Sequence, residues 1–373
     1  MEKRSCREPE SLYDRTRIGR MYFRWIGGIM SLFVLSMLCL SCKQTGAKEV
    51  ESVRLHHSLV VDDESLLLGK VFDLAWESDS VLVIVDSGNE GFLHAVHVPD
   101  GRVMYAYGKI GQGPDEYLYV GTVHPAGAHH LIMLDVNKRE CFEQEGAGDR
   151  LAFKPLFHLK DSVFHYELLP VADNRYIAIG LYEDNRFFLL DEKGNRIEGF
   201  GDYPYRDEKE KQVSGIIRGE IYQGRLASNS RGTRFVQAVL KSRIMVFYEK
   251  GEEGWKCIKE NLEFFPTYNY NSPAMDAEDP LGYLDVCATD SYVYALYSGK
   301  NYRDDRDAAF LGQTVEVYRW DGTPVKRLTS EVPLRNIEVT KDDSCLYAVA
   351  YAPEPVLVRF PLPCFHDYLS VGM

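Results

Sequence analysis

The sequence lacks the short motifs that most often mark catalytic sites. It has no Gly-Lys-Ser/Thr phosphate loop, no GxSxG serine turn and no HExxH helix. The five cysteines beyond residue 42 are scattered, without a CxxC pair or another metal spacing, at positions 141, 257, 287, 345 and 364. These absences favour a binding protein over an enzyme.

The chain also lacks an excess of basic residues. Its net charge is −13, and without residues 1–41 it would carry 36 Lys and Arg against 52 Asp and Glu, a balance of −16. An acidic surface repels nucleic-acid phosphates and anionic lipids. We therefore expect no nucleic-acid partner.

Long apolar runs are absent except at the N-terminus. Residues 25–41 carry no charge, follow Arg24 and end before Cys42, a pattern typical of a signal peptide. A membrane anchor is the alternative, but the run is short for a bilayer core of about 30 Å. We predict a signal peptide at 1–41, with Met21 the true start.

Cys42 lies where bacterial lipoproteins carry their lipid. The preceding Leu40 and Ser41 resemble a lipobox, although Cys39 stands where that motif usually has Leu. The resemblance implies cleavage before Cys42 and attachment of lipid to it, which would anchor the protein to a membrane. We predict a tether at 42–54, a propeller domain at 55–373, and a location at the bacterial outer membrane, with the side it faces left open.

Helical periodicity is almost absent from the rest of the chain. Runs of β-branched and aromatic residues alternate with turn signals, and they group in fours within 71–109, 117–159, 163–201, 222–265 and 283–332. A sixth group, 335–363, has three runs, and HHSLVVDD at 56–63 can supply the fourth. We predict an all-β, six-bladed β-propeller of four-stranded blades closed by an N-terminal strand. A large β-sandwich is the rival fold.

A glycine-rich turn follows the first group of strands. The turn holds Gly111, Gly113, Pro114, Glu116 and Tyr117, and the third group contains DEKGN and then GDYP. In this order the motifs resemble the TolB-like six-bladed propeller lipoproteins of Bacteroides-type bacteria, although Asp115 stands where that family more often has Gly. The resemblance implies the fold and the cell-envelope location, and it adds little chemistry.

The same turn raises the question of phosphate binding. A nucleotide loop opens a helix, whereas Pro114 and the following YLY lead toward a strand, so no helix dipole is available. We expect the glycines to serve left-handed turn conformations in a crossover between blades.

Four acidic residues fall at similar depths in the first strands of four groups. First strands line the central channel of a propeller, where oxygen ligands from several blades would suit Ca²⁺. Six-bladed metal-dependent lactonases use such a site, so a metal-dependent hydrolase or lyase at the channel mouth is the alternative function. The interpretation we favour is that a wet channel simply tolerates acids. The candidates are Asp73, Glu167, Asp285 and Glu338.

Three long loops stand out, at 201–220, 266–282 and 298–313. The order of strands in a propeller places them on one face, and loops of this length are often functional. They are rich in tyrosine, which offers a flat apolar ring and a hydroxyl. We predict that this face binds a glycan, a peptide or an envelope protein. The candidate ligand-binding residues are Tyr203, Tyr205, Arg206, Tyr268, Tyr270, Asn271, Tyr302 and Arg303.

Overall fold

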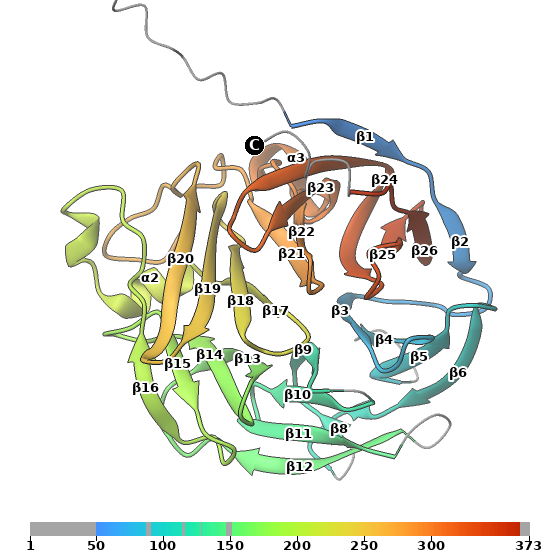
Figure 1. Cartoon of the computed structure of the whole chain (residues 1–373), viewed down its shortest axis with the longest axis horizontal. Coiled ribbons are helices and arrows are strands. Elements are labelled where there is room, and N and C mark those ends of the chain that lie inside the picture. Colours follow the sequence, from blue (N-terminus) through green and yellow to red (C-terminus); the bar gives the residue numbers. More distant parts are fainter. Residues whose placement is uncertain (1–49, 87–90, 114–115, 128, 147–150, 366–373) are drawn as a thin grey trace, which may run out of the picture. The chain divides into compact units, whose positions relative to one another are not determined.

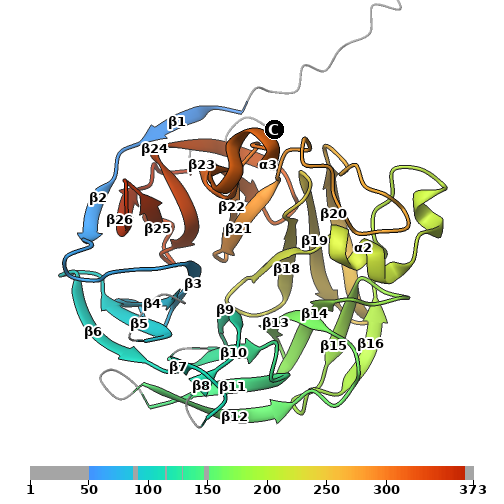
Figure 2. The same cartoon turned by 180° about the vertical axis from the view of Figure 1, so that it is seen from behind.

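The computed structural model describes residues 50–86, 91–113, 116–127, 129–146 and 151–365. The predicted signal peptide, Cys42 and most of the predicted tether lie outside this part of the chain. In the described part, six blades surround a central axis, as Figure 1 shows along that axis and Figure 2 from behind. No described helix is long and apolar enough to cross a membrane.

Each of the first four blades is an antiparallel sheet whose strands follow one another in sequence. Blade one comprises β3 (Val71–Trp76), β4 (Val81–Asp86), β5 (Leu93–His97) and β6 (Arg102–Tyr107). Blade two comprises β9 (Val120–Pro125), β10 (Leu131–Asp135), β11 (Glu140–Glu145) and β12 (Ala152–His158). Blade three comprises β13 (His165–Val171), β14 (Arg175–Gly180), β15 (Phe187–Leu190) and β16 (Arg196–Phe200). Blade four comprises β17 (Gly224–Ser228), β18 (Arg234–Val239), β19 (Ile244–Gly251) and β20 (Gly254–Leu262).

Blades five and six share one long strand. Blade five comprises β21 (Tyr283–Ala288), β22 (Tyr292–Tyr297), β23 (Gly312–Arg319) and the first part of β24 (Pro324–Val339). The second part of β24 starts blade six, which continues with β25 (Cys345–Tyr351) and β26 (Pro355–Pro361). This shared strand joins the two blades into one continuous sheet.

The ring closes through the N-terminal segment, as predicted. Strand β2 (Ser58–Val61) pairs antiparallel with β26, so it is the fourth strand of blade six. A further strand, β1 (Ser52–Leu55), pairs in parallel with β24 at the edge of blade five. The sequence did not predict β1, and the predicted boundary between tether and propeller at residue 55 falls inside it.

The core consists of layers between blades. Six buried apolar clusters occur in the described residues, and each combines side chains from two neighbouring blades. Strand β4, VLVIVD, is buried at every position because both of its faces meet another blade, whereas the outer strand β20 is mostly exposed. The predicted strand runs are therefore those of the structure, and the sandwich alternative is excluded.

The few short helices lie in the long loops. They are η2 (Glu210–Gln212), α2 (Gly215–Ile221), α3 (Tyr302–Asp305) and η3 (Arg306–Phe310). A small parallel pair, β7 (Lys109–Ile110) and β8 (Glu116–Tyr117), flanks the glycine-rich turn.

Candidate functional site

The three long loops contact one another and form one surface. They occupy residues 201–223, 263–282 and 298–311, between β16 and β17, β20 and β21, and β22 and β23. We call these residues the loop face. Arg206 in the first loop donates a hydrogen bond to the Tyr270 hydroxyl in the second at 3.0 Å. The second loop meets the third where Arg303 N donates to Ala277 O at 3.0 Å and the Arg303 side chain pairs with Glu278.

A buried carboxylate organises the first two loops. Glu210 has no exposed surface, and its Oε1 accepts hydrogen bonds from the hydroxyls of Tyr222 at 2.5 Å and Tyr268 at 2.9 Å. Its Oε2 accepts from the backbone N–H of Arg206 at 2.5 Å. Burial and the charge of Glu210 raise the pKa of both tyrosines, so both stay protonated donors. The loops thus have a small polar core of their own.

The structure divides the predicted ligand-binding residues into two groups. Tyr203 and Tyr268 are buried, with 5% and 8% of their surface exposed, and they pack inside the loops rather than offering free rings. Tyr270 is half-buried beside Tyr268, with ring centroids 5.3 Å apart. The exposed members are Tyr205, Arg206, Asn271, Tyr302 and Arg303. The expectation that Tyr268 offers a stacking surface is therefore corrected. Its ring is buried within the loops, and its hydroxyl donates to Glu210.

A groove of about 920 Å³ lies between blades three and four, at the start of the first loop. Its aromatic lining combines Tyr203 and Tyr205 with Tyr248 and Trp255, which come from β19 and β20. Its charged lining is mostly acidic: Asp202, Glu252, Glu253, Lys256 and Glu260. Sequence reasoning missed Tyr248 and Trp255 because they lie in regular strands. The one available signal was a tryptophan directly after the Gly254 turn, in a strand that is otherwise polar.

The channel acids have a structural task. Asp73 Oδ2 accepts the backbone N–H of Val123 at 2.8 Å, which ties blade one to blade two. The same contact ties blade three to four, where Glu167 accepts from Leu226 N at 3.1 Å, and blade five to six, where Asp285 accepts from Ile337 N at 2.9 Å. Every second blade thus supplies a carboxylate to the first strand of the next.

The side chain of Arg225 lies among these acids. Arg225 of blade four donates to Gly121 O at 2.9 Å and to Phe72 O, and so reaches blades two and one across the axis. Burial disfavours the charged guanidinium, but Asp73, Asp285 and Glu167 outweigh it and raise the pKa of Arg225. The charge that a metal ion would neutralise is therefore already balanced in part by arginine.

The calcium site considered as an alternative is not assembled among the described residues. No group of three or more His, Cys, Asp or Glu side chains within the described ranges is placed to hold a metal ion. Glu338 lines the channel cavity, of about 780 Å³, with Asp73, Glu167 and Asp285, and burial raises its pKa well above the usual range. These four acids do not form a Ca²⁺ site in the described geometry, because a Ca²⁺ site needs several oxygens that converge on one point.

The channel cavity opens away from the loop face. Its rim consists of turns between the first and second strands of the blades, including residues 77–79, 172–174 and 229–232. The loop face consists of connections at the other ends of these strands. The two candidate regions of the molecule are therefore separate.

The glycine-rich turn holds an anion from its own chain. Gly113 N donates to the Glu116 carboxylate at 2.7 Å, and a Cβ at Gly111 would lie 2.1 Å from the same carboxylate. Gly111 and Gly113 lie against the Glu116 carboxylate and do not have the expected left-handed angles. In this region Gly108, with φ +72°, has that conformation. A phosphate has no free cradle here.

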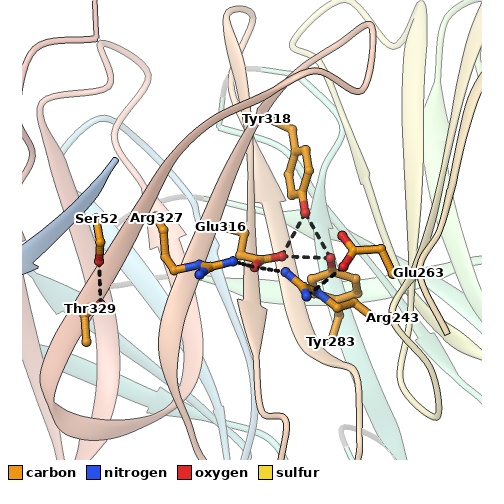
Figure 3. Close-up of polar contacts among 8 residues, drawn as sticks. All are labelled: Ser52, Arg243, Glu263, Tyr283, Glu316, Tyr318, Arg327 and Thr329. Carbon is orange, nitrogen blue, oxygen red and sulfur yellow. Dashed lines mark hydrogen bonds and ion pairs between the residues drawn. The ribbon is translucent and has the colours of Figure 1, made fainter. Parts of the chain in front are cut away.

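Beneath the second loop, a polar cluster joins blades four and five (Figure 3). Glu316 has 5% of its surface exposed and pairs with Arg243 of blade four and with Arg327. The hydroxyls of Tyr283 and Tyr318 donate to its Oε2 at 2.9 and 2.8 Å. Arg243 also reaches Glu263, the first residue of the second loop, at 2.7 Å. The loop is thereby attached to a rigid interface.

The fold and its ring of four-stranded blades define a six-bladed β-propeller. A profile of the TolB-like 6-blade propeller-like family matches residues 56–342, and the chain belongs to this family. A sequence comparison with curated proteins finds no significant match.

Two solved structures align with this chain in three dimensions. One is a gluconolactonase from Xanthomonas campestris, with a TM-score of 0.48 and 11% identity, which matches over 83% of this chain and 90% of its own. The other is the Swd1 β-propeller domain of Myceliophteria thermophila, with a TM-score of 0.46 and 13% identity, over 79% of this chain and 83% of its own.

Proposed function

We propose that this chain is a lipid-anchored cell-envelope propeller that binds a glycan in the groove between blades three and four. The observation that carries the proposal is the aromatic lining of the groove, in which Tyr205 is exposed and Trp255 half-buried, with the buried Tyr203 and Tyr248 beneath them. Aromatic rings combine apolar faces with polar edges, which suits the C–H faces and hydroxyls of sugar rings. The loop face would extend recognition along the surface through Arg206 and other exposed side chains.

The interlocked loops support this function because a preorganised surface loses little entropy on binding. Glu210 holds the first loop against Tyr268 of the second, and Arg303 holds the second against the third. The backbone that carries the exposed side chains of these loops is thus held in place by contacts between the loops. Catalysis has less support, because burial and the charge of Glu260 raise the pKa of Cys257, the thiol that lines the groove, and so keep it protonated.

Fluorescence of Trp255 provides a direct test. Trp76 and Trp320 are buried, with 8% and 4% of their surface exposed, so sugar binding at the groove should change the emission mainly of Trp255. Envelope oligosaccharides should produce a saturable change that Trp255→Phe abolishes. Tyr205→Ala should weaken binding about fivefold or more, because it removes a contact face.

The matched control is Tyr119→Ala, since Tyr119 is exposed to a similar extent, 42% against 41% for Tyr205, and lies outside the groove. If Tyr205→Ala and Tyr119→Ala weakened sugar binding equally, the groove would not be the binding site. Binding of envelope peptides, with no response to sugars, would replace the glycan by a peptide ligand.

A further inference from the structure

Arg186 is a buried cation that forms no ion pair with any residue of the described chain. The residue directly precedes β15 in blade three and has 1% of its surface exposed. Its Nε donates to Gln237 Oε1 of blade four at 2.7 Å, and its guanidinium lies 5.4 Å from the centre of the Phe187 ring. Both terminal nitrogens, NH1 and NH2, are buried and make no hydrogen bond with any described residue.

Such an arrangement is costly for a folded protein. A buried charge is usually paired, and each buried donor without an acceptor destabilises the fold. Burial lowers the pKa of Arg186, while nearby Tyr248, Tyr203 and Glu260 raise it, so the surroundings supply only partial compensation. The position therefore calls for an acceptor that the described chain does not provide.

The guanidinium lies next to the groove. The backbone N–H of Arg186 donates to Gly201 O at 2.9 Å, and Gly201 lines the groove with Tyr203 and Tyr248. The Tyr203 hydroxyl is buried as well, and it makes no hydrogen bond of normal geometry, although the backbone N–H of Tyr182 faces it. Two buried polar groups beside the groove, the Arg186 guanidinium and the Tyr203 hydroxyl, thus lack hydrogen-bond partners among the described residues.

We propose that Arg186 is the recognition site for a carboxylate, and that the glycan bound in the groove carries a sugar acid. This inference rests on the proposed function and names its ligand class. Because Nε is occupied by Gln237, the free pair NH1 and NH2 presents the end-on fork that binds two carboxylate oxygens. The Tyr203 ring must shift outward to admit the carboxylate, since Arg186 is nearly inaccessible.

The acidic rim gives the proposal a second feature. Asp202, Glu252, Glu253 and Glu260 line the groove, so its overall field repels anions. Selection for an acid must therefore come from the local fork and not from long-range attraction. Affinity for a sugar acid should accordingly fall little, or even rise, as salt is added.

The test compares glucuronate with glucose on the purified full-length chain, by Trp255 fluorescence and by calorimetry. Glucuronate should bind at least about tenfold more tightly than glucose, because the fork adds two charge-assisted hydrogen bonds. In Arg186→Met this difference should vanish, and in Arg186→Lys it should be reduced, since an ammonium lacks the fork. Arg234→Met, which removes a surface arginine of blade four paired with Glu249, should leave the difference intact.

Thermal unfolding separates this role from a purely structural one. If Arg186 is kept for a ligand, Arg186→Met should leave the melting temperature unchanged or raise it, because an unpaired buried charge is removed. A large fall in melting temperature would mean that Arg186 is a structural residue, and would overturn the proposal. Equal binding of glucuronate and glucose would also overturn it while leaving the glycan function standing. Absence of binding by both sugars and by envelope oligosaccharides would refute the glycan function itself.

Discussion

Arg243 of blade four and Glu316 of blade five form an ion pair across the interface between the two blades (Figure 3). Glu316 is nearly buried and also accepts hydrogen bonds from two tyrosines, so all of its acceptor positions face partners. Nearby carboxylates, Glu316 foremost, raise the pKa of Arg243 although burial opposes them. Arg243 therefore keeps its charge in the folded protein.

Replacement of Glu316 by Gln should destabilise the protein by about 3 kcal/mol, because it leaves Arg243 without its inner partner. Glu263→Gln is the control, since Glu263 is the outer partner of Arg243. The Glu263 side chain is 50% exposed, so its replacement should cost less than about 1 kcal/mol. Urea unfolding of the two variants measures both values. Similar losses in the two would show that the pair does not hold the blades together.

The closing strand β2 gives a second prediction. Val61 is 4% exposed and packs between blades six and one, whereas Leu59 on the same strand is 54% exposed. Val61→Asp should lower the free energy of unfolding by about 3 kcal/mol or more, because it buries a charge at the closure. Leu59→Asp should change it by less than about 1 kcal/mol. Comparable unfolding midpoints for the two variants would contradict the assignment of β2 to blade six.

The blades were predictable from sequence, and much of the site was not. Runs such as VLVIVD and CLYAVAY predict strands from local sequence alone, and the spacing of the turns between such runs predicts their grouping in fours. The pairing of β1 with β24 has no local signal, since SVRL becomes a strand only when it meets an edge that is distant in sequence. The same holds for Arg186, which next to FFLL reads as an ordinary polar residue at a strand start. Its burial arises from blade four.

The loop tyrosines give a third prediction. Tyr268→Ala should destabilise the protein by about 3 kcal/mol, because it leaves a void and removes a donor to the buried Glu210 carboxylate. Tyr270→Ala should cost less, about 1 kcal/mol, since Tyr270 is half-buried and bonds to the exposed Arg206. Thermal and urea unfolding of both variants provides the comparison. An unchanged stability in Tyr268→Ala would show that the loops do not depend on the Glu210 core.

The proposed membrane anchor is testable through Cys42. Cys42→Ala should move the protein from the membrane fraction to the released fraction, because the lipid on this residue would be its one strong attachment. A Cys257→Ala variant, which removes an exposed cysteine of the propeller, is the matched control and should stay with the membrane. Membrane association of both variants after a salt wash would exclude the lipid as the anchor.

The channel predicts a distinctive dependence of stability on pH. Burial raises the pKa of Asp73 from 3.8 to about 7, although Arg225 opposes the shift, and burial also raises the pKa of the nearby Asp285. The folded protein then binds more protons than the unfolded chain between about pH 4 and pH 7. Stability from this group is therefore greatest below pH 4 and is lost progressively as pH rises through 7.

Asp73→Asn should remove this loss, because the amide stays neutral and its carbonyl oxygen can still accept the Val123 N–H. We expect the variant to gain on the order of 1 kcal/mol or more over the parent at pH 8, and to match it below about pH 4, where Asp73 is protonated in both the folded and the unfolded chain. Asp63→Asn, which changes an exposed acid before blade one, is the control and should follow the parent curve at both pH values. Parallel unfolding curves for Asp73→Asn and the parent across this range would mean that Asp73 is already ionised in the folded protein. Arg225 would then be its full counter-charge, and the channel would be a closed ion network.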